Sequence, residues 1–316
     1  MDKQIELLRM VRQALQVNDY PLAIASLEEV VDLVHDRGDT SAEGRHLGNL
    51  ALTYYRIGQH DQALYYFEEA LKCARQNNDR MTENGLLGNM GNILREVQRY
   101  DDAIAYLNDA LMIAQELGDT RGRGIWLSNL GLVYDDWQQF EEARDLHEKS
   151  VTIARQIFDR PALALRLTNL GNSCAALKKI EKAISHYKEA LEIQRDLGRT
   201  PEVASLAQQI GNLYTIMGRK MLPDKNAYIY FNSALEHYAI GLKLARDTND
   251  EGGEGALLYS IALILADAQQ IEDATKYLAM ALEKFKSAGL QQQTQMTQQT
   301  LKKLTTQQQQ EIPGHS

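Results

Sequence analysis

The chain has 316 residues, of which 44% are hydrophobic and 24% charged, proportions that are ordinary for a globular protein. Its formal net charge of −9 argues against a nucleic-acid partner, because neutralising phosphates requires a dense basic surface. The N-terminus lacks the pattern of a signal peptide, and the longest apolar stretch, 261–266, is too short to span a bilayer. We therefore expect a cytoplasmic protein with no membrane insertion, in which Cys73 and Cys174 are reduced and buried.

An internal repeat is the dominant feature of the sequence. It is carried by an alanine that recurs every 40 residues, at Ala23, Ala63, Ala103, Ala143 and Ala183, and again at Ala234 and Ala274. The gap of 51 residues between Ala183 and Ala234 places about 11 extra residues around 219–227. Apolar residues follow most of these alanines at helical spacings, so each repeat is predicted to form two amphipathic helices, A and then B.

The predicted elements follow one another as seven helix pairs and a final helix. The pairs occupy about 2–37, 40–77, 80–117, 120–157, 160–197, 200–248 with an insertion near 219–229, and 251–288. A capping helix is predicted at 291–304, and a Gln-rich disordered tail at 306–316. Aspartates such as Asp39 and Asp79 stand where a carboxylate caps the start of helix A, and Gly38 suits a helix C-terminus.

Glycine recurs in the middle of helix A, at Gly91, Gly131, Gly171 and Gly211. Glycine there costs about 1 kcal/mol of helix propensity relative to alanine. Repetition of that cost predicts a close approach of helix A to helix B that leaves no room for a side chain.

These residues together carry a family resemblance. The second repeat shows the pattern in full, with Leu47, Leu50, Ala51, Tyr54, Gly58, Ala63, Phe67 and Ala70. This pattern resembles the tetratricopeptide repeat, whose usual period is 34 residues. The period of 40 residues is similar to that of kinesin light chain, Pins-type polarity adaptors and bacterial signalling solenoids. HEAT and armadillo arrays have a similar period but lack the alanine and aromatic signature.

The resemblance implies an all-α, right-handed solenoid of about seven helix pairs with a C-terminal capping helix. It also implies an inner face, built from helices A, that binds an extended or helical peptide. The register predicts the lining of this peptide-binding groove as Arg45, Asn49, Leu52, Tyr55, Arg56, Asn89, Asn92, Arg95, Ile125, Asn129, Leu132, Asp136, Leu165, Asn169, Asn172, Gln209 and Asn212.

One position of this groove holds an asparagine row, which comprises Asn49, Asn89, Asn129 and Asn169 and is continued by Gln209. Asparagine inside a helix costs roughly 0.5–0.7 kcal/mol relative to alanine, so its repetition requires an explanation. The amides either tie each helix to the neighbouring repeat or pair with the backbone of a bound segment, since an amide both donates and accepts. Similar asparagines line the groove of kinesin light chain and Pins-type adaptors, and this resemblance supports the second explanation.

Motifs for catalysis or metal binding are not found in the sequence. It contains no phosphate-binding glycine loop, nucleophile elbow or CxxC pair. His147 and His186 occupy packing positions of helices B, and the acidic pairs 135–136 and 141–142 indicate a solvated or groove-facing cluster. We therefore predict no catalytic residues, no cofactor, no metal and no enzyme activity.

The leading functional interpretation is a non-enzymatic scaffold or adaptor that binds a protein or peptide partner in its groove. The alternatives are a peptide-sensing regulatory subunit and a self-associating structural assembly protein.

Chaperone-binding members of the family use basic residues on helix A to hold a terminal carboxylate. None of the matching positions in this chain is basic: they hold Gly48, Gly88, Ser128, Thr168 and Gln208. We therefore predict no strong binding to chaperone C-termini. The insertion is either a tolerated surface loop or a basic, apolar contact region. The sequence leaves the partner and the oligomeric state open.

Overall fold

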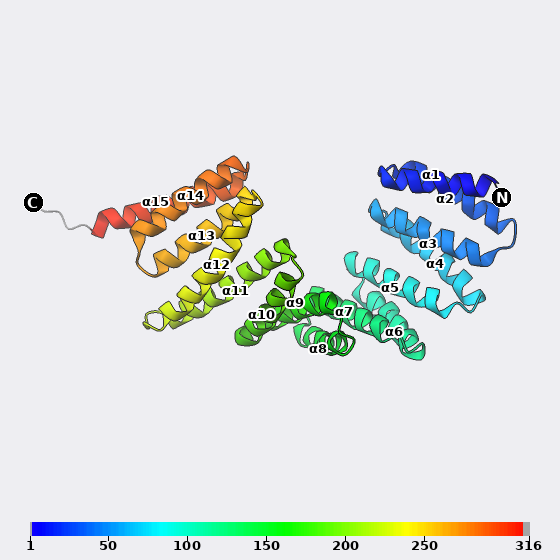
Figure 1. Ribbon diagram of the computed structural model, residues 1–316, viewed down its shortest axis with the longest axis horizontal. Coiled ribbons are helices and arrows are strands. Elements are labelled where there is room, and N and C mark those ends of the chain that lie inside the picture. The colour runs from blue at the N-terminus through cyan, green and yellow to red at the C-terminus, as the bar shows by residue number, and fades with distance from the viewer. Residues whose placement is uncertain (1, 312–316) are drawn as a thin grey trace, which may run out of the picture. The chain divides into compact units, whose positions relative to one another are not determined.

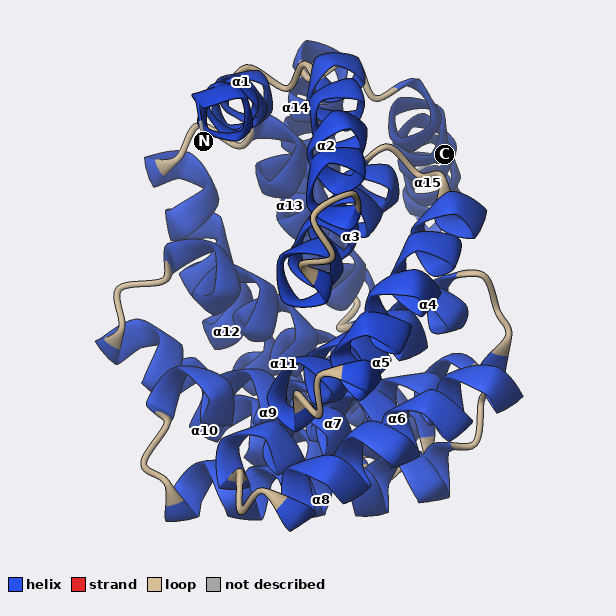
Figure 2. Cartoon of the chain, turned by 90° about the vertical axis from the view of Figure 1, so that its right-hand side faces the viewer, coloured by secondary structure: helices blue, strands red, loops and turns tan. Residues whose placement is uncertain are grey.

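The computed structural model describes residues 2–311, with side chains described from 3 to 306. No strand occurs within these residues, and short connections join one helix to the next (Figure 2). The helices are α1 (Asp2–Gln16), α2 (Tyr20–His35), α3 (Thr40–Arg56), α4 (His60–Gln76), α5 (Arg80–Glu96), α6 (Tyr100–Glu116), α7 (Thr120–Asp136), α8 (Phe140–Gln156), α9 (Arg160–Ala176), α10 (Ile180–Asp196), α11 (Thr200–Met221), α12 (Ala227–Asp247), α13 (Glu251–Asp267), α14 (Ile271–Ser287) and α15 (Gln291–Glu311).

The predicted all-α fold class is confirmed. Each odd-numbered helix from α1 to α13 packs against the helix that follows it, as helix A against helix B. The chain divides into two compact units, Met1–Asp159 and Arg160–Ser316, and within each unit successive pairs stack on one another (Figure 1). One buried cluster joins Phe67 of the second pair to Leu87 and Ile113 of the third, so each pair completes the core of its neighbour.

Caps define the helix ends as the sequence predicts. The side chains of Asp39, Asp79 and Asp119 each accept a hydrogen bond from the backbone N–H three residues ahead. Gly38 and Gly118 end their helices with a φ of 68°, in the left-handed region that glycine enters without a steric penalty. The connection from helix B to the next helix A can therefore be as short as three residues, as at 117–119, which brings successive pairs side by side.

The predicted close approach of helices A and B is also confirmed. An added Cβ atom at Gly171 would lie 2.4 Å from the Tyr187 ring, and one at Gly131 would lie 2.5 Å from the His147 ring. At Gly91 the same atom would lie 2.6 Å from the Leu107 side chain. Glycine is thus required at these positions because a large side chain of helix B occupies the space.

The insertion lengthens two helices rather than forming a long loop. α11 has 22 residues and α12 has 21, so only 222–226 connect them. Phe231 packs across Gly218, where an added Cβ atom would lie 2.4 Å from its ring, and Ala227 is fully buried. The predicted surface loop is therefore confined to five residues at the end of an ordered helical hairpin.

The C-terminal helix α15 is longer than predicted. It runs to Glu311, so 306–311 are helical where the sequence suggested disorder, and the remaining tail, 312–316, lies outside the described residues. Leu301 and Leu304 pack against the last helix pair, as expected of a capping helix.

Candidate functional site

The predicted groove residues lie on helices A of both units. They belong to α3, α5 and α7 in the first unit and to α9 and α11 in the second. Leu52, Ile125 and Leu165 are 39%, 40% and 59% exposed, one on each of α3, α7 and α9. Because α3, α5 and α7 bury their opposite sides in the core of the first unit, the predicted residues on them mark one solvent-facing surface of that unit, and those on α9 and α11 belong separately to the second unit.

Three members of the asparagine row, Asn49, Asn89 and Asn129, lie on this surface of the first unit, and Asn169 and Gln209 lie on α9 and α11 of the second unit. Asn49 is exposed, Asn89 and Asn129 are half-buried, and Asn169 is 8% exposed. Their side-chain amides make no hydrogen bond to any residue that the structure describes. Gln209 donates from Nε2 to Ser205 Oγ, at 3.3 Å, one turn earlier in its own helix.

In the first unit, polar contacts join neighbouring helices A at their C-terminal ends. The Tyr55 hydroxyl of α3 donates to Glu96 Oε1 of α5 at 2.6 Å, and this hydrogen bond raises the pKa of Tyr55. Arg95 Nε of α5 lies 3.3 Å from Asp136 Oδ2 of α7, which forms an ion pair. Three predicted groove residues, Tyr55, Arg95 and Asp136, therefore also hold adjacent repeats together.

In the second unit, two predicted groove amides contact helix B of their own repeat. The Tyr187 hydroxyl donates to Asn172 Oδ1 at 2.7 Å, and the Tyr238 hydroxyl donates to Asn212 Oδ1 at 2.7 Å. The sequence analysis missed this use of the amides. The signal was present, since a tyrosine on helix B recurs with an asparagine on helix A in both repeats.

The acidic stretch on α7 and α8 is divided among separate partners. Asp135 Oδ2 lies 3.0 Å from Nε2 of His147, which is fully buried, whereas Asp136 faces Arg95. Glu141 pairs with Arg144 one turn later. Among the described residues, no group of three or more histidine, cysteine, aspartate or glutamate side chains has the arrangement of a metal site.

A buried carboxylate that the sequence analysis did not single out links two repeats of the first unit. Glu83 is 4% exposed, and its two oxygens accept hydrogen bonds from Arg75 Nε at 2.7 Å and Arg80 Nη1 at 2.6 Å. Burial alone would raise the pKa of Glu83, but the two arginines outweigh it and lower the pKa. Glu254 holds the same repeat position in the second unit and accepts from Arg246 at 2.7 Å.

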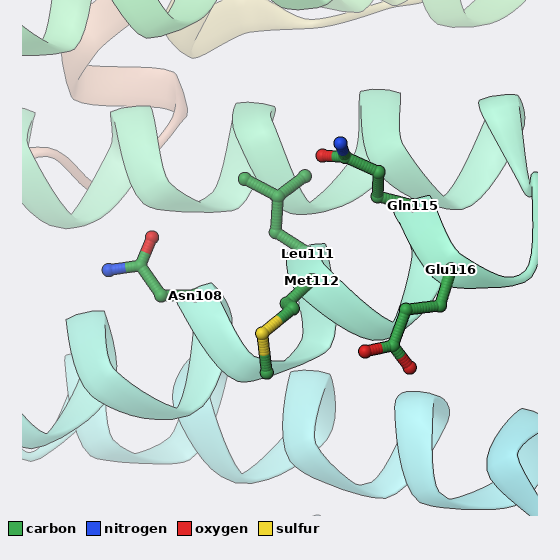
Figure 3. A pocket seen from close by; sticks show the side chains of 5 residues that line it. All are labelled: Asn108, Leu111, Met112, Gln115 and Glu116. Atoms are coloured by element: carbon green, nitrogen blue, oxygen red, sulfur yellow. The ribbon is translucent and has the colours of Figure 1, made fainter.

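Two hollows in the surface lie away from the asparagine row. One of about 490 Å³ lies on helix B of the third pair, and its five lining side chains all come from α6 (Figure 3): Asn108, Leu111, Met112, Gln115 and Glu116. Another, of about 380 Å³, lies between α11, α12 and α13. No described helix is long and apolar enough to cross a membrane.

The fold and the repeat signature define a family. The sequence profile of the tetratricopeptide repeat matches residues 6–76, 82–156 and 162–220. These segments cover more than half of the chain, which therefore belongs to the tetratricopeptide-repeat family. Among curated protein sequences, none matches the chain significantly.

Solved structures with the same fold include three informative neighbours. BtubC (BKLC) from P. vanneervenii superposes with a TM-score of 0.61 at 19% identity, over 77% of this chain and 92% of that one. Repeats of a putative kinesin light chain from Podosopora anserina give a TM-score of 0.55 at 17% identity, over 63% and 99%. A Rap protein complexed with competence and sporulation factor gives 0.54 at 14% identity, over 96% and 86%. At these identities the likeness concerns the fold.

Proposed function

We propose that this chain is a non-enzymatic scaffold or adaptor that binds a segment of a partner protein along the exposed surface of helices α3, α5 and α7 in its first unit. The carrying observation is the asparagine row, of which Asn49, Asn89 and Asn129 lie on this surface with side-chain amides that form no hydrogen bond to a described residue. Membership of the tetratricopeptide-repeat family supports a protein as the partner. The net charge of −9 weighs against nucleic acid.

The chemistry of the surface suits the backbone of a bound segment. Each amide offers a carbonyl acceptor and an NH₂ donor, so a row of them pairs with peptide groups largely independently of sequence. Leu52 and Ile125 supply apolar contacts for the segment's side chains. Arg45 and Arg56 are exposed cations on α3 that favour an acidic residue at that end.

Two half-buried members of the row allow the proposal to be tested. The partner is first identified by affinity purification and mass spectrometry, and its bound segment is then titrated calorimetrically as a synthetic peptide. Asn89→Ala with Asn129→Ala is expected to weaken binding by about 1 kcal/mol for each lost hydrogen bond, or about fivefold each. The melting temperature is expected to stay near that of the parent.

Asn108→Ala provides the matched control, because Asn108 is an exposed asparagine within helix B of the third repeat. It is expected to change neither binding nor stability appreciably. A large fall in the melting temperature of the Asn89→Ala, Asn129→Ala variant, with unchanged binding per folded molecule, would make the row a structural tie and contradict the proposal.

A peptide-sensing regulatory subunit is the second candidate. It is favoured by the fold similarity to the Rap protein complexed with competence and sporulation factor. A sensor is expected to change its radius of gyration in small-angle scattering when the peptide binds, because binding shifts the conformational equilibrium. A scaffold is expected to bind the same segment with no such change.

A further inference from the structure

The extension of α11 and α12 forms an ordered projection from the repeat architecture. The two helices lie side by side up to their connection (Figure 1), and Phe231 packs across Gly218 inside the extension. Arg219 Nε pairs with Asp267 Oδ2 of α13 at 2.6 Å, and Asp224 Oδ1 accepts from the backbone N–H of Asn226 at 2.8 Å. These contacts fix the base and the turn of the projection.

Large apolar side chains are exposed at the end of this projection. Met221, Leu222, Tyr228 and Ile229 are 36%, 38%, 42% and 63% exposed. Single exposed apolar residues are normal on protein surfaces, whereas a group of them marks an interaction site. The repeat does not require these residues, since they belong to the segment by which this repeat exceeds the others.

Positive charge accompanies the apolar group. Lys220 and Lys225 are exposed and form no ion pair with any described residue. The nearby Asp224 accepts a backbone hydrogen bond and Arg219 is paired with Asp267, so the tip carries two lysines and one carboxylate outside any ion pair among the described residues. The projection therefore presents two unpaired cations beside apolar side chains, on a chain whose net charge is −9.

We propose that this hairpin tip, comprising Lys220, Met221, Leu222, Lys225, Tyr228 and Ile229, is a second docking surface for a protein segment that combines acidic and apolar side chains. Charge complementarity selects the acidic partner, and the exposed apolar group provides the contact area. An anionic bilayer is disfavoured as the occupant because the acidic body of the chain would be repelled from it. The tip shares no residue with the exposed surface of α3, α5 and α7, and it does not depend on the function proposed there.

Selection from a displayed library of random peptides on the full-length chain tests the proposal, with counter-selection on the Lys220→Glu, Lys225→Glu variant. Synthetic versions of the selected peptides are then titrated by fluorescence anisotropy. The expected peptides carry acidic residues beside apolar ones and bind the charge-reversal variant at least about tenfold more weakly. Ile229→Ser is expected to weaken them as well.

Two controls separate this surface from the others. Lys182→Glu reverses an exposed lysine elsewhere in the second unit and is expected to leave peptide binding unchanged. Asn89→Ala with Asn129→Ala alters the asparagine row, and it too is expected to have no effect on these peptides. Because all the altered side chains at the tip are exposed, the melting temperatures of the tip variants are expected to stay close to that of the parent.

The proposal is overturned if no selected peptide depends on Lys220 and Lys225, or if the dependent peptides are not acidic. It is also overturned if the tip variants abolish co-sedimentation with vesicles of phosphatidylcholine and phosphatidylserine while peptide binding persists. That result would make the tip a membrane contact.

Discussion

The third and fifth helix pairs place the same dipeptide, glycine followed by asparagine, in different surroundings. In the first unit, Gly91 of α5 faces the apolar side chain of Leu107, and the side chain of Asn92 makes no hydrogen bond to a described residue. In the second unit, Gly171 of α9 faces the Tyr187 ring, and the hydroxyl of that ring donates to Asn172 at 2.7 Å. The residue on helix B thus decides whether the amide on helix A is engaged inside the repeat.

The fourth pair adds an intermediate case. Gly131 faces His147, whose Nε2 reaches Asp135 on the same helix A at 3.0 Å. Leu132 stands where the neighbouring pairs have asparagine. One packing arrangement therefore accommodates an apolar side chain with no polar partner on helix A, an imidazole that reaches Asp135, or a hydroxyl that reaches Asn172. Position within a repeat is consequently insufficient to assign a groove role.

The largest expected effect concerns the close packing of helix A against helix B. Gly171→Val is expected to lower the free energy of unfolding by about 3 kcal/mol, because the new side chain would overlap the Tyr187 ring. Gly85→Val is the control, since no atom lies within 4 Å of a Cβ atom at this helix-A glycine. Its unfolding free energy should stay near the parent's in urea titrations. Equal losses in the two variants would contradict the packing account.

A smaller effect is expected from the hydrogen bond alone. Tyr187→Phe should lower the free energy of unfolding by roughly 0.5–1.5 kcal/mol, and Asn172→Ala should lower it by less, because alanine is the better helix former. The double variant should lose less than the sum of the two. Asn92→Ala, which removes an amide facing no hydroxyl, should cause no loss, because alanine is the better helix former. Additive losses in the Tyr187–Asn172 cycle would show that the two side chains do not interact.

The helix pairs, their caps and their close packing could be predicted because the sequence signals of the repeat are local. A carboxylate before helix A, such as Asp39, and a glycine inside it, such as Gly171, each have one physical explanation. The length of the α11–α12 hairpin was misjudged because the extra residues were counted as connection. The spacing of Ala227, Phe231 and Ala234 already continues the buried face of α12 toward its N-terminus.

The candidate site was less predictable, because its polar contacts join residues that are far apart in the sequence. Tyr55 meets Glu96, and Arg95 meets Asp136, through the stacking of one repeat on the next. Periodicity places such residues on a face of a helix but does not say which of them engage one another. The surface role of the asparagine row accordingly stays a prediction.

Backbone substitution in the bound segment tests the central claim most directly. An ester in place of one peptide N–H removes a single donor from the segment without altering its side chains. At the residue facing Asn89 or Asn129, the ester is expected to weaken binding to the parent chain by about fivefold. The same ester should cause no further loss in the Asn89→Ala, Asn129→Ala variant. If esters along the whole segment leave its affinity unchanged, or weaken binding equally in the parent and the variant, the asparagine row does not pair with the partner's backbone.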